Sequence, residues 1–229
     1  MGWLRLATIL EDAGLKPEAV DIVAAGGDRG QVYHAIPRAK ALDPDTIVAY
    51  SQNGSPLTRE NGYPVRLIVP GWTGISHTKW LVQIEALDQP FIGFYNNRYY
   101  IFETPGLPKT PVQAAGVKSF ITQPTPNTQL PAGQPVTITG FAYSGQAPIK
   151  QVEISVDGGK TYVTAAMISP IQKWAWVRWQ YIWTPQERGM ADLRSRAADQ
   201  AGNVQPETVA WNRYGYGYNA IQSVKVQVA

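Results

Sequence analysis

Apolar residues at the start of the chain recur at helical spacing. They share one face of a helix at Trp3, Leu6, Ile9 and Leu10. This spacing predicts a helix over about residues 3–13, with Gly14 in the position at a helix C-terminus that favours a positive φ.

The remainder of the first half shows strand-like patterns separated by turn residues. We expect a strand at 19–27 that runs into a Gly-rich loop, a short helical turn at 36–43, and a hairpin at Asn53–Gly54. Two further strands are expected, one with alternating Tyr63, Val65, Leu67 and Val69 and one in KWLVQIEAL. Helices mixed with strands indicate an α+β fold for this half.

The composition changes at residues 104–112, where TPGLPKTPV holds three prolines and predicts an extended linker. Beyond it the patterns are those of short strands, including a hairpin at 149–165, so we expect an antiparallel β-sandwich. The domains predicted from this change are residues 1–107 and 112–229.

The tryptophan-rich stretch KWAWVRWQYIWTP changes the face of its aromatic residues partway along. Trp174 and Trp176 share one parity, whereas Trp179, Tyr181 and Trp183 share the other, which predicts a β-bulge near 177–178. Such a strip is typical of a sandwich core and an interface, and an exposed strip would instead suit a sugar-binding surface.

Composition narrows the class of protein. The 229 residues carry a net charge of only +3, which does not favour nucleic acid as a partner. No stretch approaches the roughly 20 apolar residues of a membrane span, and no signal-peptide pattern follows Met1. The sequence contains no cysteine, so it offers neither a disulfide nor a thiolate ligand.

The candidate chemistry gathers after the strand that ends near Val69. Ser76, His77 and Lys79 fall within four positions, and Arg66 lies on the strand itself. A guanidinium, an ammonium and loop N–H groups together make a cradle for an anion such as phosphate. An ordinary polar loop would show the same residue types, and local sequence leaves both interpretations open.

Two further segments combine aromatic residues with polar groups. In NNRYYIFE, an extended backbone would place Tyr99 and Tyr100 on opposite faces, one of them directed inward as a packed residue or as a phenol donor. WNRYGYGYNA surrounds Arg213 with tyrosine and glycine, as a tight loop or as a cation delivered to a pocket.

Several ordered motifs resemble the sulfite oxidase family of molybdenum enzymes. NGYPVRLIVPGWTGISHTKWL is similar to the family's pterin-binding strand and loop. VTITGFAYSG, IKQVEISVDGGKTY, KWAWVRWQ and AGNVQPE are similar to strands of its C-terminal dimerisation domain. The resemblance implies an α+β molybdopterin-binding domain, incomplete at its N-terminus, followed by an all-β immunoglobulin-like sandwich.

The resemblance also implies a Mo-molybdopterin cofactor and assigns residues to it. Tyr100 matches the family's active-site tyrosine, and Arg213 lies one residue before Tyr214, which occupies the place of the substrate-binding arginine. The cofactor-binding positions would be Asp28, Asn61, Arg66, Ser76, His77, Thr78 and Lys79.

What the resemblance implies about function is oxygen-atom transfer to sulfite or a related sulfur oxyanion. It also implies a homodimer through the sandwich, a haem protein or cytochrome as electron acceptor, and relatives that are often periplasmic. The family's molybdenum-ligating cysteine has no counterpart here, so we expect the chain to begin after that segment and to be inactive alone. A non-catalytic dimerisation or assembly fragment and a sugar-binding sandwich are the alternatives.

Overall fold

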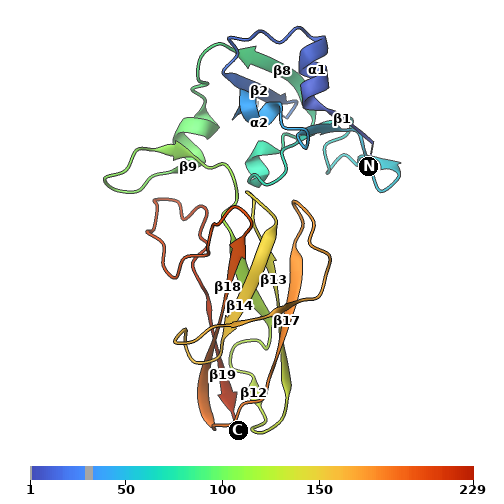
Figure 1. The fold of residues 1–229 in the computed structure, drawn as a ribbon. Coiled ribbons are helices and arrows are strands. Elements are labelled where there is room, and N and C mark those ends of the chain that lie inside the picture. The colour runs from blue at the N-terminus through green and yellow to red at the C-terminus, as the bar shows by residue number, and fades with distance from the viewer. Residues whose placement is uncertain (1, 29–32) are drawn as a thin grey trace. The chain divides into compact units, whose positions relative to one another are not determined.

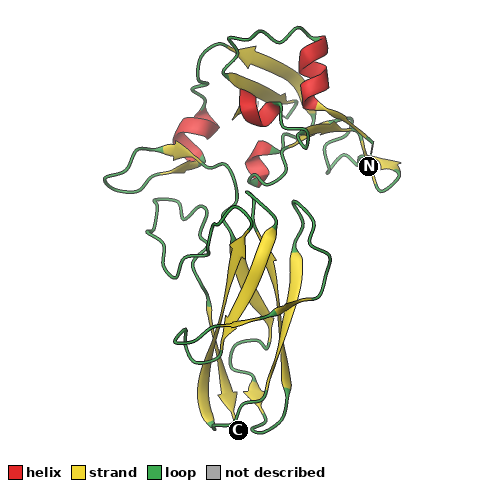
Figure 2. Ribbon diagram, in the orientation of Figure 1, coloured by secondary structure: helices red, strands yellow, loops and turns green. Residues whose placement is uncertain are grey.

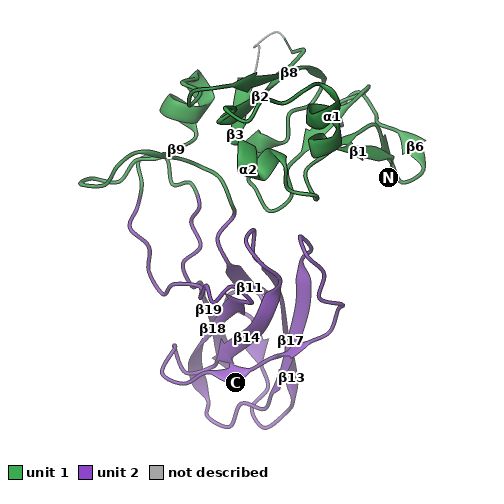
Figure 3. Cartoon of the chain, turned by 45° about the horizontal axis from the view of Figure 1, so that its top comes forward, with its two compact units in different colours: residues 1–114, 212–216 green, residues 115–211, 217–229 purple. Residues whose placement is uncertain are grey.

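The computed structural model describes residues 2–28 and 33–229. The chain divides into two compact units, which Figure 3 colours separately. Unit 1 comprises residues 1–114 and 212–216, and unit 2 comprises residues 115–211 and 217–229. Unit 1 therefore takes in a short segment from the C-terminal part of the sequence.

Unit 1 is built from two small antiparallel sheets, short helices and two hairpins. One sheet has the order β1 (Trp3–Arg5), β4 (Ile47–Ala49) and β7 (Arg66–Ile68), and the other has β3 (Tyr33–Pro37), β2 (Asp21–Gly26) and β8 (Leu81–Leu87). The helical elements are α1 (Leu6–Asp12), α2 (Arg38–Ala41), the 3₁₀ turn η1 (Gly74–Ser76) and the π-helical turn η2 (Tyr95–Tyr99). Figure 1 labels β1, β2, β8, α1 and α2 among these elements.

The N-terminal helix is shorter than its sequence pattern predicts. Residues 3–5 form β1, which pairs with β4, and α1 begins only at Leu6. The backbone of Trp3 is paired in the sheet and its side chain remains 44% exposed, so strand pairing outweighs the helical spacing at this end. Leu6 and Leu10 lie one helical turn apart and are buried in the core of unit 1, as predicted.

Other local predictions for unit 1 are confirmed. Asn53 and Gly54 both have positive φ, 52° and 81°, in the turn between β5 (Ser51–Gln52) and β6 (Ser55–Pro56). α2 provides the expected helical turn, and β2, β7 and β8 provide the expected strands.

The proline-rich segment is not an extended linker. β9 (Ile101–Phe102) pairs with β10 (Thr110–Pro111), so most of 104–112 forms the loop and second strand of a hairpin within unit 1. Val112 is 2% exposed, and its N–H donates to the carbonyl of Tyr100 over 2.8 Å. Burial of this valine fixes the segment against unit 1, which composition alone could not indicate.

Unit 2 consists of strands and loops among its described residues, as Figure 2 shows. One sheet contains β11 (Lys118–Gln123), β13 (Val136–Tyr143), β17 (Val177–Trp183) and β16 (Ala166–Met167), in that order. The other contains β12 (Gln129–Leu130), β19 (Ser223–Val228), β18 (Gly189–Asp199), β14 (Ile149–Ser155) and β15 (Val163–Thr164). Fully buried residues from both sheets form one core, among them Ile138, Val152, Trp179, Leu193 and Val226.

The tryptophan-rich stretch contains no bulge near 177–178. β17 begins at Val177 and pairs with β13 in unbroken register, whereas Trp174 has a φ of +64° and precedes the strand. The change of parity arises because the strand starts after Trp176. Trp179 is fully buried over Gly140, where a Cβ would lie 2.3 Å from the indole, so the aromatic residues do not share one exposed face.

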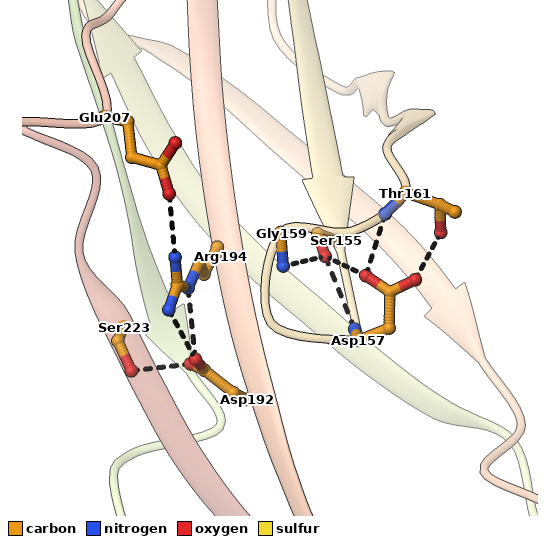
Figure 4. Close-up of polar contacts among 8 residues, drawn as sticks. All are labelled: Ser155, Asp157, Gly159, Thr161, Asp192, Arg194, Glu207 and Ser223. Carbon is orange, nitrogen blue, oxygen red and sulfur yellow. Dashed lines mark hydrogen bonds and ion pairs between the residues drawn. The ribbon is translucent and has the colours of Figure 1, made fainter.

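The predicted hairpin at 149–165 is confirmed, and side chains fix its turn (Figure 4). The Asp157 carboxylate accepts from Ser155 Oγ over 2.6 Å, from Thr161 Oγ1 over 2.6 Å and from Thr161 N–H over 3.0 Å. These hydrogen bonds hold the pKa of Asp157 below its usual range, with Ser155 the largest cause. Nearby on β18, Arg194 binds Asp192 through Nε and Nη2 over 3.0 and 2.9 Å.

Candidate cofactor site

The alternation of side chains along strand β7 sets the direction of Arg66, whose neighbour Leu67 faces the core. Leu67 and Val69 are 2% and 0% exposed, so alternation directs Arg66 to the opposite face. The chain then turns through η1 and returns with Lys79 two residues before the start of β8. Strand and return segment are joined by a hydrogen bond from the N–H of Leu67 to the carbonyl of Thr78 over 2.9 Å.

Arg66 and Lys79 both reach the backbone of residues 58–62. Arg66 Nη1 donates to the carbonyl of Asn61 over 3.1 Å, and Lys79 Nζ donates to the carbonyl of Glu60 over 3.1 Å. Gly62 has a φ of +101°, and a Cβ there would lie 3.0 Å from Lys79 Cβ. The two cations therefore converge on one loop, and glycine permits that loop to approach. We call Arg66, Lys79 and residues 58–62 the cradle.

The guanidinium of Arg66 keeps donor capacity that the described residues do not use. Its Nη2 donates to the carbonyl of His77 over 3.4 Å, whereas its buried Nε finds no hydrogen-bond partner among the residues described. Partial burial lowers the pKa of Arg66 from its ordinary value, and the group still stays cationic at neutral pH.

His77 contacts Arg66 through its backbone carbonyl and not through its ring. Both ring nitrogens have other backbone partners. The N–H of Val69 donates to Nδ1 over 3.4 Å, and Nε2 lies 3.3 Å from the carbonyl of Trp72. This pairing favours the tautomer protonated at Nε2. The pKa of His77 lies below its ordinary value, mainly because the ring is buried. The ring is therefore neutral at pH 7.

A cavity of about 600 Å³ opens beside the cradle. Its lining residues are Gly27, Asp28, Arg59, Tyr63 and Trp80. The indole Nε1 of Trp80 donates to the carbonyl of Arg59 over 2.8 Å, which fixes the ring in place. Asp28 thus lies on a cavity that adjoins the cradle, while the rest of its glycine-rich loop, residues 29–32, lies outside the described residues.

Tyr99 and Tyr100 do not lie on one extended strand, because β9 begins only at Ile101. Residues 95–99 form η2, and Tyr100 follows at its end with its N–H bonded to the carbonyl of Tyr95 over 3.0 Å. The segment 212–216 also belongs to unit 1, where the N–H of Arg213 donates to the carbonyl of Glu103 over 2.9 Å. Tyr100 and Tyr216 lie in contact, with ring centroids 5.3 Å apart.

Arg213 does not point a free charge into this group of rings. Its Nη1 lies 3.3 Å from Glu103 Oε2, and its side chain is 64% exposed. Glu103 also binds Lys109 over 2.7 Å. The guanidinium is therefore held at the surface by a carboxylate that it shares with a second cation.

Comparison with known proteins shows the family to which the chain belongs. The oxidoreductase molybdopterin-binding domain matches residues 2–95, and the Mo-co oxidoreductase dimerisation domain matches residues 109–229. The chain belongs to the sulfite oxidase family.

Two groups of relatives illustrate the similarity. Mitochondrial sulfite oxidases of rat and human are 35% and 36% identical to this chain over 98% of its length. The crystal structure of the sulfane dehydrogenase SoxCD from Paracoccus pantotrophus aligns with a TM-score of 0.88 and 31% identity, over 98% of this chain and 59% of that chain. The chain spans 45% of the rat enzyme and 46% of the human enzyme.

Membership of the sulfite oxidase family implies a Mo-molybdopterin cofactor, and the cradle has the chemistry for its organic part. Lys79 and the unpartnered Nε–H of Arg66 suit a phosphate, and the flat indole of Trp80 lines a cavity large enough for a ring system. Buried hydroxyls of Ser76 and Thr78 also lack partners among the described residues. The two cations of the cradle therefore fit a phosphate group, whereas Ser76 and Thr78 are only 0% and 4% exposed.

The metal itself finds no comparable set of ligands. The sequence has no cysteine, and the described residues contain no group of three His, Cys, Asp or Glu side chains that could hold a metal ion.

Within the described residues, no helix is long and apolar enough to cross a membrane.

Sequence reasoning considered His34 on β3 only as a metal ligand, with two histidines too few for a metal site, and gave it no other role. This side chain is 2% exposed, and both ring nitrogens lack partners among the residues described. Burial, and secondly the neighbouring His77, lower the pKa of His34 to about 4. A histidine inside an apolar strand, YHAIP, was the available signal, but only the fold brings it beside His77.

Asn61 lies in the cradle but turns its side chain away from Arg66. Its Nδ2 donates to Thr58 Oγ1 over 3.1 Å, and its backbone carbonyl is the group that binds the guanidinium. A substitution that keeps the backbone would therefore keep this contact to Arg66.

Proposed function

We propose that this chain holds the molybdopterin and forms the dimer in an oxidoreductase that oxidises a reduced sulfur compound by oxygen-atom transfer. The observation that carries the proposal is the convergence of Arg66 and Lys79 on residues 58–62, beside a cavity lined by Trp80. Two cations with unused donor capacity suit the phosphate of a pterin cofactor.

The bound cofactor supplies the oxygen atom and accepts two electrons; for sulfite, the balance is sulfite plus water to sulfate, two protons and two electrons. This chain's residues bind and orient. Arg66 and Lys79 neutralise the phosphate, Thr78 and Ser76 add hydroxyl donors, and Asp28 accepts from the heterocycle. Tyr100 offers a phenol donor on the substrate side, and Arg213 at its rim attracts an anion.

We further propose sequence domains at residues 1–107 and 112–229, of which the second lends residues 112–114 and 212–216 to the compact unit 1. The second domain would be an immunoglobulin-like sandwich that forms a homodimer. The match to a dimerisation domain and the shared core of two sheets support this assignment. Sedimentation of the full chain at micromolar concentration should give the mass of a dimer. A monomer at high concentration would contradict the homodimer. Electrons would leave singly to a haem protein or cytochrome.

The names of the relatives indicate two classes of substrate. The rat and human proteins are named for sulfite, and the Paracoccus protein is named for sulfane. We propose a reduced sulfur compound of one of these classes. The molybdenum thiolate would come from outside the 229 residues, because they contain no cysteine.

A non-catalytic role in dimerisation or assembly is the second candidate, favoured by that same lack of a cysteine. Expression in cells that make molybdopterin separates the two. Oxidation of any cofactor in the purified protein yields a fluorescent pterin, and mass spectrometry measures molybdenum. The pterin content should be well above that of a matched double variant, Arg66→Ala with Lys79→Ala. Equal, background pterin in both proteins would leave only the assembly role.

A further inference from the structure

Four tyrosines of unit 1 form a closed ring of contacts. Their centroid separations are 6.4 Å for Tyr99–Tyr100, 5.3 Å for Tyr100–Tyr216, 5.8 Å for Tyr214–Tyr216 and 6.1 Å for Tyr99–Tyr214. We call these four residues the tyrosine cluster. It joins two segments that lie more than a hundred residues apart in the sequence.

Asn212 holds the second segment in the shape that the cluster requires. Its Oδ1 accepts from the N–H groups of Tyr214 and Tyr216 over 3.3 and 3.2 Å, and its Nδ2 donates to the carbonyl of Tyr216 over 2.7 Å. Asn212 is 7% exposed, so these hydrogen bonds are shielded from water. The tyrosines are thus positioned by the fold rather than gathered loosely at the surface.

The charged groups around the cluster lie at its edge. Arg213 and Lys109 share the carboxylate of Glu103. The guanidinium of Arg98 lies 5.9 Å from the Phe94 ring, and its carbonyl accepts from Tyr214 Oη over 3.4 Å. The guanidinium of Arg213 also lies 5.1 Å from the centroid of the Tyr214 ring. The cluster itself consists of aromatic rings and hydroxyls, and the cations that contact its edge can attract an anion.

Position 214 is a tyrosine, where the resemblance to the sulfite oxidase family implies a substrate-binding arginine. A guanidinium offers a planar fork of charged donors that matches an oxyanion in two places. A phenol offers one neutral donor and an aromatic ring. Divalent sulfur is polarisable and makes favourable contacts with aromatic rings, often at the ring edge. Four adjoining rings multiply that opportunity, and none of the four side chains carries the fixed charge that a guanidinium would offer to a fully oxygenated oxyanion.

We propose that the tyrosine cluster selects substrates with an exposed divalent, sulfane-type sulfur over fully oxygenated sulfur oxyanions. The inference rests on the proposed function, and it decides between the two substrate classes left open there. The cations at the rim hold an anionic end of the substrate, and the rings contact its reduced sulfur. Tyr214 is the specificity-determining residue.

Thiosulfate and sulfate are a matched pair of probes for the test. Both are tetrahedral dianions, and thiosulfate has a terminal sulfur where sulfate has an oxygen. Each is titrated into the full chain, with ¹³C-labelled tyrosine rings followed by NMR. Thiosulfate should bind about ten-fold more tightly than sulfate, with the largest shifts on the tyrosine cluster. Equal dissociation constants, or shifts confined to other tyrosines, would overturn the proposal.

Variants at position 214 separate ring from charge. Tyr214→Arg should remove most of the thiosulfate preference, because sulfate gains a charge-assisted partner. Tyr214→Phe should retain it, because the ring remains. Tyr218→Phe, which changes a tyrosine of unit 2 that contacts Trp211, is the control and should behave as the parent chain. Retention of the full preference in Tyr214→Arg would contradict the assignment.

The two proposals fail separately in these measurements. A chain that carries pterin but binds both probes equally would refute the sulfur selectivity alone. A chain that prefers thiosulfate but never carries pterin would refute the cofactor role and leave a sulfane-binding surface.

Discussion

Arg66 Nη1 lies 3.1 Å from the backbone carbonyl oxygen of Asn61, so the cationic side chain of one strand fixes the loop that faces it. The contact joins β7 to residues 58–62 and leaves Nε–H without a partner among the described residues. A bound phosphate would complete this set of donors.

Replacement of Arg66 by alanine should lower cofactor content. Loss of a charge-assisted hydrogen bond costs roughly 1.5–3 kcal/mol, equivalent to about ten-fold or more in affinity at limiting cofactor. Pterin fluorescence and molybdenum content of the assembled enzyme measure the effect. Lys160→Ala, which changes an exposed lysine of unit 2, is the control and should retain full content. Unchanged pterin in Arg66→Ala would remove Arg66 from the site.

The close approach of Gly62 to Lys79 gives a second prediction. Gly62→Ala places a Cβ 3.0 Å from Lys79 Cβ in a residue with a φ of +101°, so it should destabilise unit 1 by about 1–3 kcal/mol and reduce cofactor content. Gly54→Ala is the matched control, since its φ is +81° and its Cβ would meet nothing within 4 Å.

Urea unfolding of the two glycine variants isolates the contact with Lys79. Gly54→Ala carries only the backbone penalty of a positive φ, so Gly62→Ala should be the less stable of the two. Equal stability of the two proteins would show that Lys79 moves aside freely, and the cradle would then not depend on this glycine.

These residues also show how far sequence reasoning reaches. The alternation around Leu67 placed β7 and directed Arg66 to its outer face, and the turn at Asn53–Gly54 followed from local chemistry. The start of α1 did not follow from local chemistry, because Trp3 pairs with β4, more than forty positions away in the sequence. Predictions of local structure succeeded where neighbours in sequence decide the energy.

The candidate site shows the same division. Sequence pattern identified Arg66 and Lys79, but only the fold shows that they share residues 58–62 as a partner. It could not reveal that both ring nitrogens of His77 are occupied by backbone groups, or that Tyr100 and Tyr216 meet. Contacts between distant segments depend on packing, which residue spacing does not encode.

His34 predicts a dependence of stability on pH. Its pKa is about 4 in the folded chain and 6.5 when unfolded, so the unfolded state binds more protons between these values. Stability should therefore fall as pH drops from 7 towards 4, with a loss of about 2 kcal/mol by pH 5 from this group. The lowered pKa of His77 acts in the same direction.

Urea unfolding at pH 7 and pH 5 measures this effect, and His34→Gln is the informative variant. Glutamine does not titrate in this range, so the variant should lose less stability between the two pH values than the parent chain, whatever its stability at pH 7. An identical loss in both proteins would show that His34 is solvated or already protonated in the folded state.

The last prediction concerns catalysis by the 229 residues alone. They contain no cysteine, and their described part holds no group of three side chains suited to a metal ion. A neutral imidazole brings no negative charge to a high-valent metal, and both ring nitrogens of His77 are hydrogen-bonded to backbone. We therefore expect no sulfite-dependent reduction of ferricyanide or cytochrome c by this chain alone.

Addition of a polypeptide that supplies the thiolate should restore turnover, provided that the cradle remains intact. The same assembly with Arg66→Ala should show activity reduced in proportion to its pterin content, because this residue acts through binding of the cofactor. Turnover by the chain alone, at stoichiometric molybdenum, would contradict the argument and would require a metal ligand other than cysteine. Molybdenum analysis of the same samples distinguishes this outcome from a trace of contaminating enzyme.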